Sequence, residues 1–237
     1  MKIRIVSLMV LGLICATMLA TVLVPARALA QAQSEQNLQI LAQVGMQMGE
    51  NMQALTGYTF QQRTAVQVNG ETKNVTLVQV AFGPDRNPMM TTISSEPPEK
   101  LSGGPIRRHI EEDKINEMKG TIEQVVQLSN SYLMLNQESL RQLGQMAQIW
   151  MSPDGSAIRL VASGFRQPGD QVTIMADGLT KRQTQTQVTT SVFGGPMTIL
   201  AQYQKWPTGL NYNAQTVINV PAKGMQITIN TFNYVKQ

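Results

Sequence analysis

The fold is indicated most clearly by residues 58–82, which read YTFQQRTAVQVNGETKNVTLVQVAF. Over residues 58–68 the side chains alternate between two faces, and this period of two predicts a β-strand with one apolar face. That face carries Tyr58, Phe60, Val66 and Val68. Asn69-Gly70 follows, a dipeptide that tolerates the positive φ angles of a two-residue hairpin turn. The stretch therefore predicts a β-hairpin whose return strand covers about residues 71–82.

Beyond residue 155 the chain is nearly all strand and turn. Alternation predicts strands near residues 157–162, 171–176, 182–192, 197–206, 212–220 and 225–235. Glycine and proline clusters such as Gly194-Gly195-Pro196 separate these runs. Consecutive strands joined by tight turns predict an antiparallel meander. With the hairpin and a shorter strand around residues 89–93, we expect about nine strands.

Three amphipathic helices are predicted to cover this meander. Apolar residues recur at helical spacing from Leu38 to Leu55. A second helix begins at Pro105, because proline suits the first helical position, and a third covers about residues 137–149. The order of elements predicts an α+β fold. We expect a curved antiparallel sheet, an incomplete barrel, with the three helices covering its concave face.

The first 30 residues have the composition of a cleavable bacterial export signal. Lys2 and Arg4 precede an uncharged run over residues 5–24, and Ala28-Leu29-Ala30 supplies a cleavage site. The alternative is a retained membrane anchor, since twenty mostly apolar residues are about enough to cross a bilayer. We therefore predict a signal peptide over residues 1–30, a disordered polar segment over residues 31–37 and a single domain over residues 38–237, located in the periplasm or secreted.

The predicted signal also distorts the overall composition. It holds the one cysteine, Cys15, and three of the 19 basic residues, so the rest of the chain carries 16 basic against 15 acidic residues. A nearly neutral domain lacks the basic surface that nucleic acids or anionic membranes require. We expect no nucleic-acid partner and no stable membrane span after cleavage. Without disulfides, the exported domain must be held together by its core.

Residues for catalysis or metal binding are scarce. The single histidine, His109, stands in a charged segment whose simplest interpretation is a solvated helix face. Zinc and iron sites need several histidine or cysteine ligands. The acidic cluster consists of Glu111, Glu112, Asp113 and Glu117. We interpret this cluster as exposed charge, and we expect no catalytic residue, no metal, no cofactor and no enzymatic activity.

Methionine is unusually frequent, with 15 residues in the chain. Several lie on the predicted helix faces, namely Met46, Met48, Met52, Met118 and Met146. Methionine is flexible and polarizable, so it suits surfaces that adapt to varied apolar partners such as acyl chains. The alternative is that these methionines are ordinary core residues.

The order of elements resembles the outer-membrane lipoprotein carrier family, which has the LolA-like fold. Residues 54–63 (ALTGYTFQQR) look like the helix-to-strand junction of such proteins, and residues 209–223 look like the tail of secreted relatives. The resemblance implies an incomplete β-barrel closed by helices around a hydrophobic cavity. Residues 80–88 match the family's arginine-proline strand poorly, so Arg86 takes over no role from it.

The function that these observations favour is a non-enzymatic periplasmic binding module. We expect a lipid or a lipidated protein to be held between sheet and helices, in lipid or lipoprotein transport. The expected cavity lining is Met48, Met52, Tyr58, Phe60, Val66, Val68, Met118 and Ile122. An envelope protein is a further expected partner. Two alternatives are a protein-interaction or sensing scaffold with a closed core, and a secreted hydrolase that would use His109 or the acidic cluster.

Overall fold

The computed structural model describes residues 39–83, 87–96 and 105–237. The chain divides into two compact units between Gln43 and Val44, and the whole sheet belongs to the second unit, Val44–Gln237. The predicted signal over residues 1–30 and the polar segment over residues 31–37 lie outside the described residues. Both stay predictions, as does the single domain over residues 38–237.

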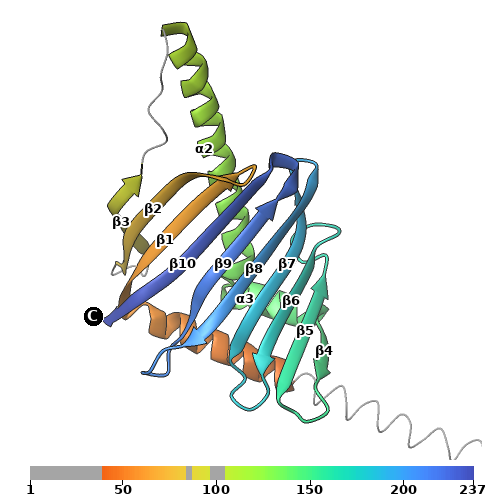
Figure 1. The fold of residues 1–237 in the computed structure, drawn as a ribbon. Coiled ribbons are helices and arrows are strands. Elements are labelled where there is room, and N and C mark those ends of the chain that lie inside the picture. Colours follow the sequence, from red (N-terminus) through yellow and green to blue (C-terminus); the bar gives the residue numbers. More distant parts are fainter. Residues whose placement is uncertain (1–38, 84–86, 97–104) are drawn as a thin grey trace, which may run out of the picture. The chain divides into compact units, whose positions relative to one another are not determined.

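Ten strands form one antiparallel sheet that is not closed (Figure 1). The strands are β1 (Tyr58–Val68), β2 (Glu71–Phe82), β3 (Pro88–Glu96), β4 (Gln148–Met151), β5 (Ala157–Ser163), β6 (Gln171–Asp177), β7 (Gln183–Val192), β8 (Gly195–Lys205), β9 (Asn211–Val220) and β10 (Met225–Lys236). Their order in the sheet is β3-β2-β1-β10-β9-β8-β7-β6-β5-β4. The predicted meander is confirmed, and the pairing of β1 with β10 joins its two segments.

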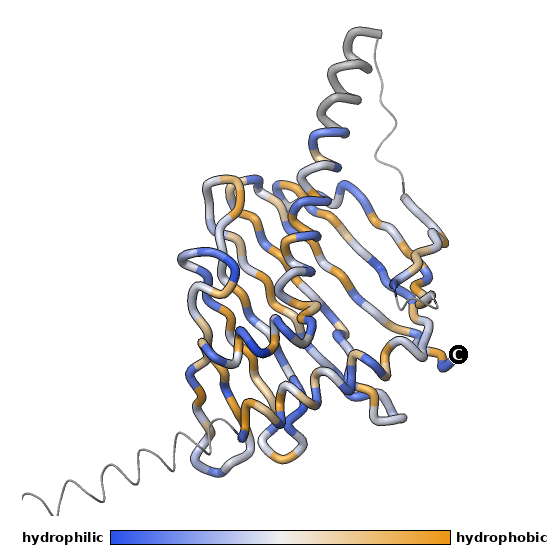
Figure 2. The backbone as a smooth tube through the Cα atoms, turned by 180° about the vertical axis from the view of Figure 1, so that it is seen from behind, coloured by the Kyte–Doolittle hydropathy of each residue, from blue (hydrophilic) through white to orange (hydrophobic). Residues whose placement is uncertain are grey.

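Within the second unit, three helical segments lie on one face of the sheet, as predicted (Figure 2). They are residues 44–55, which end an N-terminal helix that begins at residue 39, α2 (Pro105–Leu133) and α3 (Gln137–Met146). Asn136 caps α3, because its side-chain oxygen accepts a hydrogen bond from the Ser139 backbone N–H at 2.8 Å. None of the helices, over the residues described, has both the length and the apolar character that a membrane span requires.

The sheet has ten strands, one more than the sequence predicted, and the additional strand is β4. The predicted third helix ran to Ile149, because apolar residues kept their helical spacing to that point. The helix in fact ends at Met146, and Ala147 adopts an extended conformation with φ −77° and ψ 134°. Ile149 then pairs with Leu160 of β5. Pairing with a neighbouring strand therefore overrides the local periodicity.

The turn between β1 and β2 has the predicted form. Asn69 and Gly70 have φ angles of 52° and 83°, as a two-residue hairpin turn requires. The Asn69 backbone N–H also donates to the Gly224 carbonyl at 2.8 Å, which ties this turn to the one before β10. A Cβ at Gly224 would lie only 2.1 Å from the Asn69 Oδ1 atom, so the close approach requires glycine.

A β-bulge near the end of β10 changes which side chains face inward. Thr59 pairs with Val235 and Gln61 with Phe232, so two residues of β10 oppose one residue of β1. Asn233 takes up the irregularity with a φ angle of 55°. As a result Tyr234 is buried, whereas Val235 is 61% exposed.

The inner face of strands β5–β8 is closed by tightly packed aliphatic side chains. Ile158, Ile174, Val188 and Ile199 are at most 1% exposed. Helix α2 is anchored beside them through a buried carboxylate, Asp170. Asp170 accepts hydrogen bonds from the Tyr132 hydroxyl, from the Thr190 hydroxyl at 2.6 Å, and from two backbone N–H groups, at 3.0 and 2.9 Å.

Candidate functional site

A cavity of about 570 Å³ lies between the helices and the part of the sheet formed by β1, β2, β9 and β10. It is partly open, and most of its lining surface is apolar. Side chains from the N-terminal helix, from α2 and from the loop between β8 and β9 complete its walls. Packed protein interiors contain few voids larger than a water molecule, so a hollow of this size is a binding site candidate.

Aromatic rings form the sheet-side wall of the cavity. Phe60 stacks on Tyr234 with ring centroids 4.8 Å apart, and Tyr234 contacts Tyr212 at 4.6 Å. Trp206 adds an edge-on contact with Tyr212 at 5.8 Å. The rings pack against one another, with Val80 and Leu210 in the same cluster. A wall of this kind is rigid and presents a broad apolar surface.

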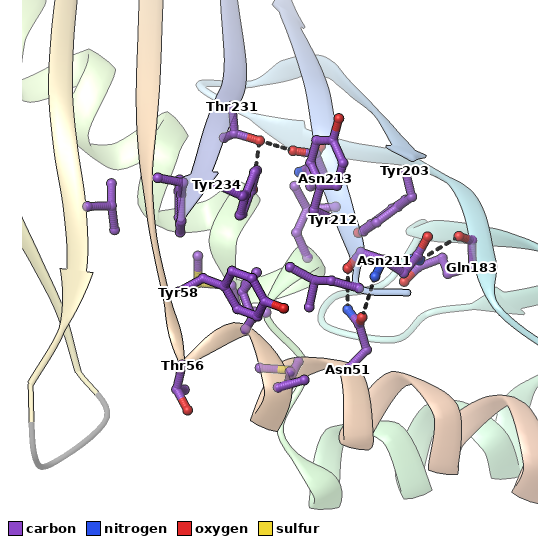
Figure 3. Close-up of a pocket in the computed structure, with 18 of the residues that line it drawn as sticks. Asn51, Thr56, Tyr58, Gln183, Tyr203, Asn211, Tyr212, Asn213, Thr231 and Tyr234 are labelled. Atoms are coloured by element: carbon purple, nitrogen blue, oxygen red, sulfur yellow. Dashed lines mark hydrogen bonds between the residues drawn. The ribbon is translucent and has the colours of Figure 1, made fainter. Parts of the chain in front are cut away.

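Two tyrosine hydroxyls of this wall are held in place by hydrogen bonds. The Tyr234 hydroxyl donates to the Thr231 Oγ1 atom at 3.0 Å (Figure 3). The Tyr58 hydroxyl pairs with Thr208 Oγ1 at 2.9 Å. Burial raises the pKa of the Tyr234 phenol above its usual range. Burial also raises the pKa of Tyr203 to about 12. These phenols are therefore neutral at physiological pH and add polarity without charge.

A reciprocal amide pair ties the N-terminal helix to the start of β9. The Asn51 Nδ2 atom donates to the Asn211 carbonyl at 2.5 Å, and the Asn211 backbone N–H donates to Asn51 Oδ1 at 2.7 Å (Figure 3). The Asn211 side chain in turn donates to the Gln183 carbonyl at 2.8 Å. The pair fixes the distance between the N-terminal helix and the start of β9 at the edge of the cavity.

Flexible methionines line the cavity on its exposed side. Met52, Met90 and Met134 are 42%, 60% and 59% exposed. Met52 belongs to the N-terminal helix, Met90 belongs to β3, and Met134 directly follows α2. Met48 is half-buried beside them. Because methionine adapts its shape, these residues can cover apolar groups of different sizes.

Among the described residues that line the cavity, two carry a formal charge, Glu50 and Arg182. The Glu50 carboxylate is exposed and accepts a hydrogen bond from Gln47 Nε2 at 3.0 Å. Arg182 is half-buried and directly precedes β7. One buried acceptor in the lining also lacks a hydrogen bond within the described part of the chain, the Asn213 Oδ1 atom. Glu50, Arg182 and Asn213 thus supply isolated polar groups in a mostly apolar lining.

The structure brings half of the predicted lining residues together. Met48, Met52, Tyr58 and Phe60 line the cavity, and whether they bind a ligand stays a prediction. Four others lie outside its lining, namely Val66, Val68, Met118 and Ile122. Val66 is buried further along β1, and Val68 is the last residue of that strand.

The part of α2 that lines the cavity lies closer to the C-terminal end of the helix than the sequence indicated. Its contributions are Val126, Ser129, Asn130 and Leu133, and Met134 directly after the helix adds to them. Val125, Ser129 and Tyr132 are buried at helical spacing, but such spacing cannot give the point at which the helix crosses the sheet. Met118 and Ile122 therefore lie one to two turns before the cavity.

The residues considered for catalysis are only partly described. The side chains of His109, Glu111, Glu112 and Asp113 lie outside the described residues. Glu117 is exposed, with its carboxylate 3.9 Å from the Lys223 Nζ atom. Within the described ranges, no three His, Cys, Asp or Glu side chains gather as metal ligands would.

Sequence reasoning missed Asn51, Arg182, Asn211, Tyr212 and Tyr234. The alternation in β9 could have suggested an inward Tyr212, since Tyr212, Thr216, Ile218 and Val220 are all buried on even positions. No local signal marks Tyr234, because the bulge at Asn233 brings it inward. The pairing of Asn51 with Asn211 joins residues 160 positions apart, which no local pattern reveals.

No family model matches the chain, and no curated protein sequence matches it. Among solved structures, it is similar to a DUF1329 family protein from Desulfovibrio piger, with 8% identity and a TM-score of 0.38 over 86% of this chain and 92% of that one. It is also similar to a LolA superfamily protein from Nitrosomonas europaea, with 8% identity and a TM-score of 0.35 over 80% and 93%. A likeness at this level concerns the arrangement of helices and strands alone. The architecture expected from the sequence, an unclosed antiparallel sheet with helices on one face, is what the chain forms.

Proposed function

We propose that the chain is an exported, non-enzymatic module that binds a hydrophobic ligand, a lipid or the acyl chain of a lipidated protein, in the cavity between sheet and helices. The observation that carries the proposal is the cavity itself. Its volume of about 570 Å³ falls within the range of roughly 300–1,000 Å³ typical of small-molecule sites. Engineered cavities of about 150 Å³ already bind small apolar molecules.

The chemistry of the lining supports an acyl chain as the occupant. The wall consists of stacked rings and aliphatic side chains, and burial raises the pKa of the Tyr234 phenol, which keeps it uncharged. Burial of each methylene in such surroundings contributes about 0.8 kcal/mol, so a long chain gains affinity without any directed contact. The exposed methionines Met52, Met90 and Met134 would cover the part of the ligand nearest solvent.

The alternative of a closed interaction scaffold predicts an interior filled by its own side chains. That description fits the inner face of β5–β8, where Ile158, Val188 and Ile199 are fully buried. It does not fit the region of β1, β9 and β10, where the hollow lies. The cavity therefore favours ligand binding over a scaffold role.

The first test is to identify what the full chain carries when it is purified from a bacterial envelope fraction. Native mass spectrometry followed by solvent extraction should reveal a co-purifying lipid or acyl group. A fluorescent acyl probe should then bind to the delipidated protein in competition with that lipid.

A matched pair of variants localises the binding. Asn130 lines the cavity, while Gln127 lies exposed on the same helix outside the lining. We expect Asn130→Phe to fill the hollow and weaken probe binding at least tenfold, and Gln127→Phe to leave binding unchanged. The proposal fails if no lipid co-purifies and no acyl probe binds, or if the two variants bind the probe equally well.

A further inference from the structure

The guanidinium of Arg182 stands in the cavity lining without a partner among the described residues. Ion pairs elsewhere in the described chain join Lys73 to Glu71, Arg141 to Glu138 and Lys223 to Glu117. No hydrogen bond or ion pair joins the Arg182 side chain to any described residue. Arginine offers five N–H donors in a planar fork, which in a half-buried position require acceptors.

The loop between β8 and β9 lies beside this guanidinium. Gly209 lies next to it, with φ at 91°, and a Cβ built there would be 3.9 Å from the Arg182 Nη2 atom. Both residues line the cavity, as does Thr208, whose hydroxyl pairs with that of Tyr58. A fixed positive charge and two hydroxyls thus stand on the lining of a largely apolar hollow.

The one negative charge among the described lining residues does not neutralise Arg182. The Glu50 carboxylate lies outside ion-pair distance of the guanidinium and accepts from Gln47 instead. The remaining lining residues of the described chain are neutral. Within the described residues, Arg182 is therefore an unpaired cation in a mostly apolar lining.

We infer that the ligand is an amphiphile with one anionic head group, whose carboxylate or phosphate binds Arg182 while its acyl chain lies against the ring wall. This inference rests on the proposed function and names the chemical class of its ligand. Guanidinium binds carboxylates and phosphates through two parallel charge-assisted hydrogen bonds, which are about twice as strong as neutral ones. Uncharged glycerides or alcohols of the same chain length lack this contact.

The test compares three probes with the same acyl chain on the delipidated full-length protein. Palmitate supplies a carboxylate, 1-palmitoyl lysophosphatidic acid supplies a phosphate, and monopalmitin has no charge. Binding is measured by displacement of the uncharged dye Nile red. We expect at least one anionic probe to bind ten times more tightly than monopalmitin, and the stronger of the two identifies the head group.

Two variants assign the preference to the guanidinium. Arg182→Gln should abolish the preference for the anionic probe, so that this probe binds the variant no more tightly than monopalmitin does. Arg63→Gln makes the same charge change on an exposed position of β1 outside the lining, so it should keep the preference. Arg182→Lys retains the charge but loses the planar fork, so it should keep part of the preference for the anionic probe.

The possible failures of the two proposals are distinct. Equal binding of all three probes to the wild-type protein overturns the inference about the head group and leaves acyl binding in place. An Arg182→Gln variant that loses affinity for charged and uncharged probes by the same factor also overturns it. Absence of binding by every acyl probe overturns the proposed function together with the inference.

Discussion

The inner face of β5–β8 and that of β1, β2, β9 and β10 belong to one sheet but are filled in different ways. On β5–β8, aliphatic side chains such as Ile174 and Val188 are buried completely, and the Tyr132–Asp170 hydrogen bond anchors α2 beside them. On the other strands, tyrosine and phenylalanine rings pack against one another along the wall, and a hollow of about 570 Å³ remains in front of them. We call these the closed half and the open half.

The comparison suggests that stability and binding are served by different halves of the sheet. Branched aliphatic side chains interdigitate with a covering helix and leave no void. Rings that stack on each other bury much of their surface within the wall. The helices therefore need not fill the space between the wall and themselves. The closed half can then hold the open half in a shape that contains a cavity, at the cost of the packing energy missing there.

Replacement of the central carboxylate of the closed half should have the largest effect on stability. Asp170→Ala leaves two hydroxyls and two backbone N–H groups without their buried acceptor. We expect the free energy of unfolding to fall by about 3 kcal/mol, as measured by urea denaturation. Asp154→Ala, on an exposed turn, serves as the control and should cost under about 1 kcal/mol. Equal effects would show that Asp170 does not stabilise the closed half in this way.

A pair of tyrosine variants compares one hydroxyl in each half. Tyr132→Phe removes a buried donor to a carboxylate, and we expect a loss of about 2 kcal/mol. Tyr58→Phe removes a hydroxyl that pairs with Thr208 at the cavity, and the loss should be about 0.5 kcal/mol. Thermal and chemical denaturation of both variants measure the difference. A larger loss for Tyr58→Phe would contradict the assignment of stability to the closed half.

A pair of valine variants makes the same comparison for apolar packing. Val188 is fully buried in the closed half, and Val80 is buried but borders the cavity. We expect Val188→Ala to lower the free energy of unfolding by about 1.5 kcal/mol, and Val80→Ala by about half as much, because one side of Val80 faces the cavity. Losses of equal size would indicate that the hollow beside Val80 is filled.

The closed half should also give stability a dependence on acid pH. Burial alone would raise the pKa of Asp170, but its hydrogen bonds from Thr190, Tyr132 and the backbone outweigh burial and lower the pKa. The folded state therefore binds fewer protons than the unfolded state. This stabilisation is complete above the ordinary aspartate pKa of about 4, and it is lost as the pH falls through the folded-state pKa.

The measurement compares wild type with Asp170→Asn over a series of pH values. The difference in free energy of unfolding should be greatest near neutral pH and should narrow below about pH 4. A difference that stays constant from pH 7 into the acid range would mean that Asp170 does not titrate with folding.

Most of the secondary structure could be predicted because it depends on local patterns. Alternation gave strands over residues 171–176 and 225–235, and the structure has them as Gln171–Asp177 and Met225–Lys236. The prediction failed at β4, where strand pairing ended the helix early. The site was half predicted, since Met48, Met52, Tyr58 and Phe60 line the cavity while Met118 and Ile122 do not. Helical spacing shows which side of α2 is buried, but the crossing point of a helix on a sheet depends on both partners.

The sequence by itself determined the alternating strands, the Asn69-Gly70 turn and the amphipathic helices, because each follows from the stereochemistry of a few neighbouring residues. The tertiary structure alone decided the pairing of β1 with β10 and the bulge that buries Tyr234. It also decided that Arg182 stands unpaired at the edge of a hollow, within the part of the chain that is described. A cavity forms where side chains from different segments do not touch one another. The identity of those side chains depends on how segments distant in the sequence pack together.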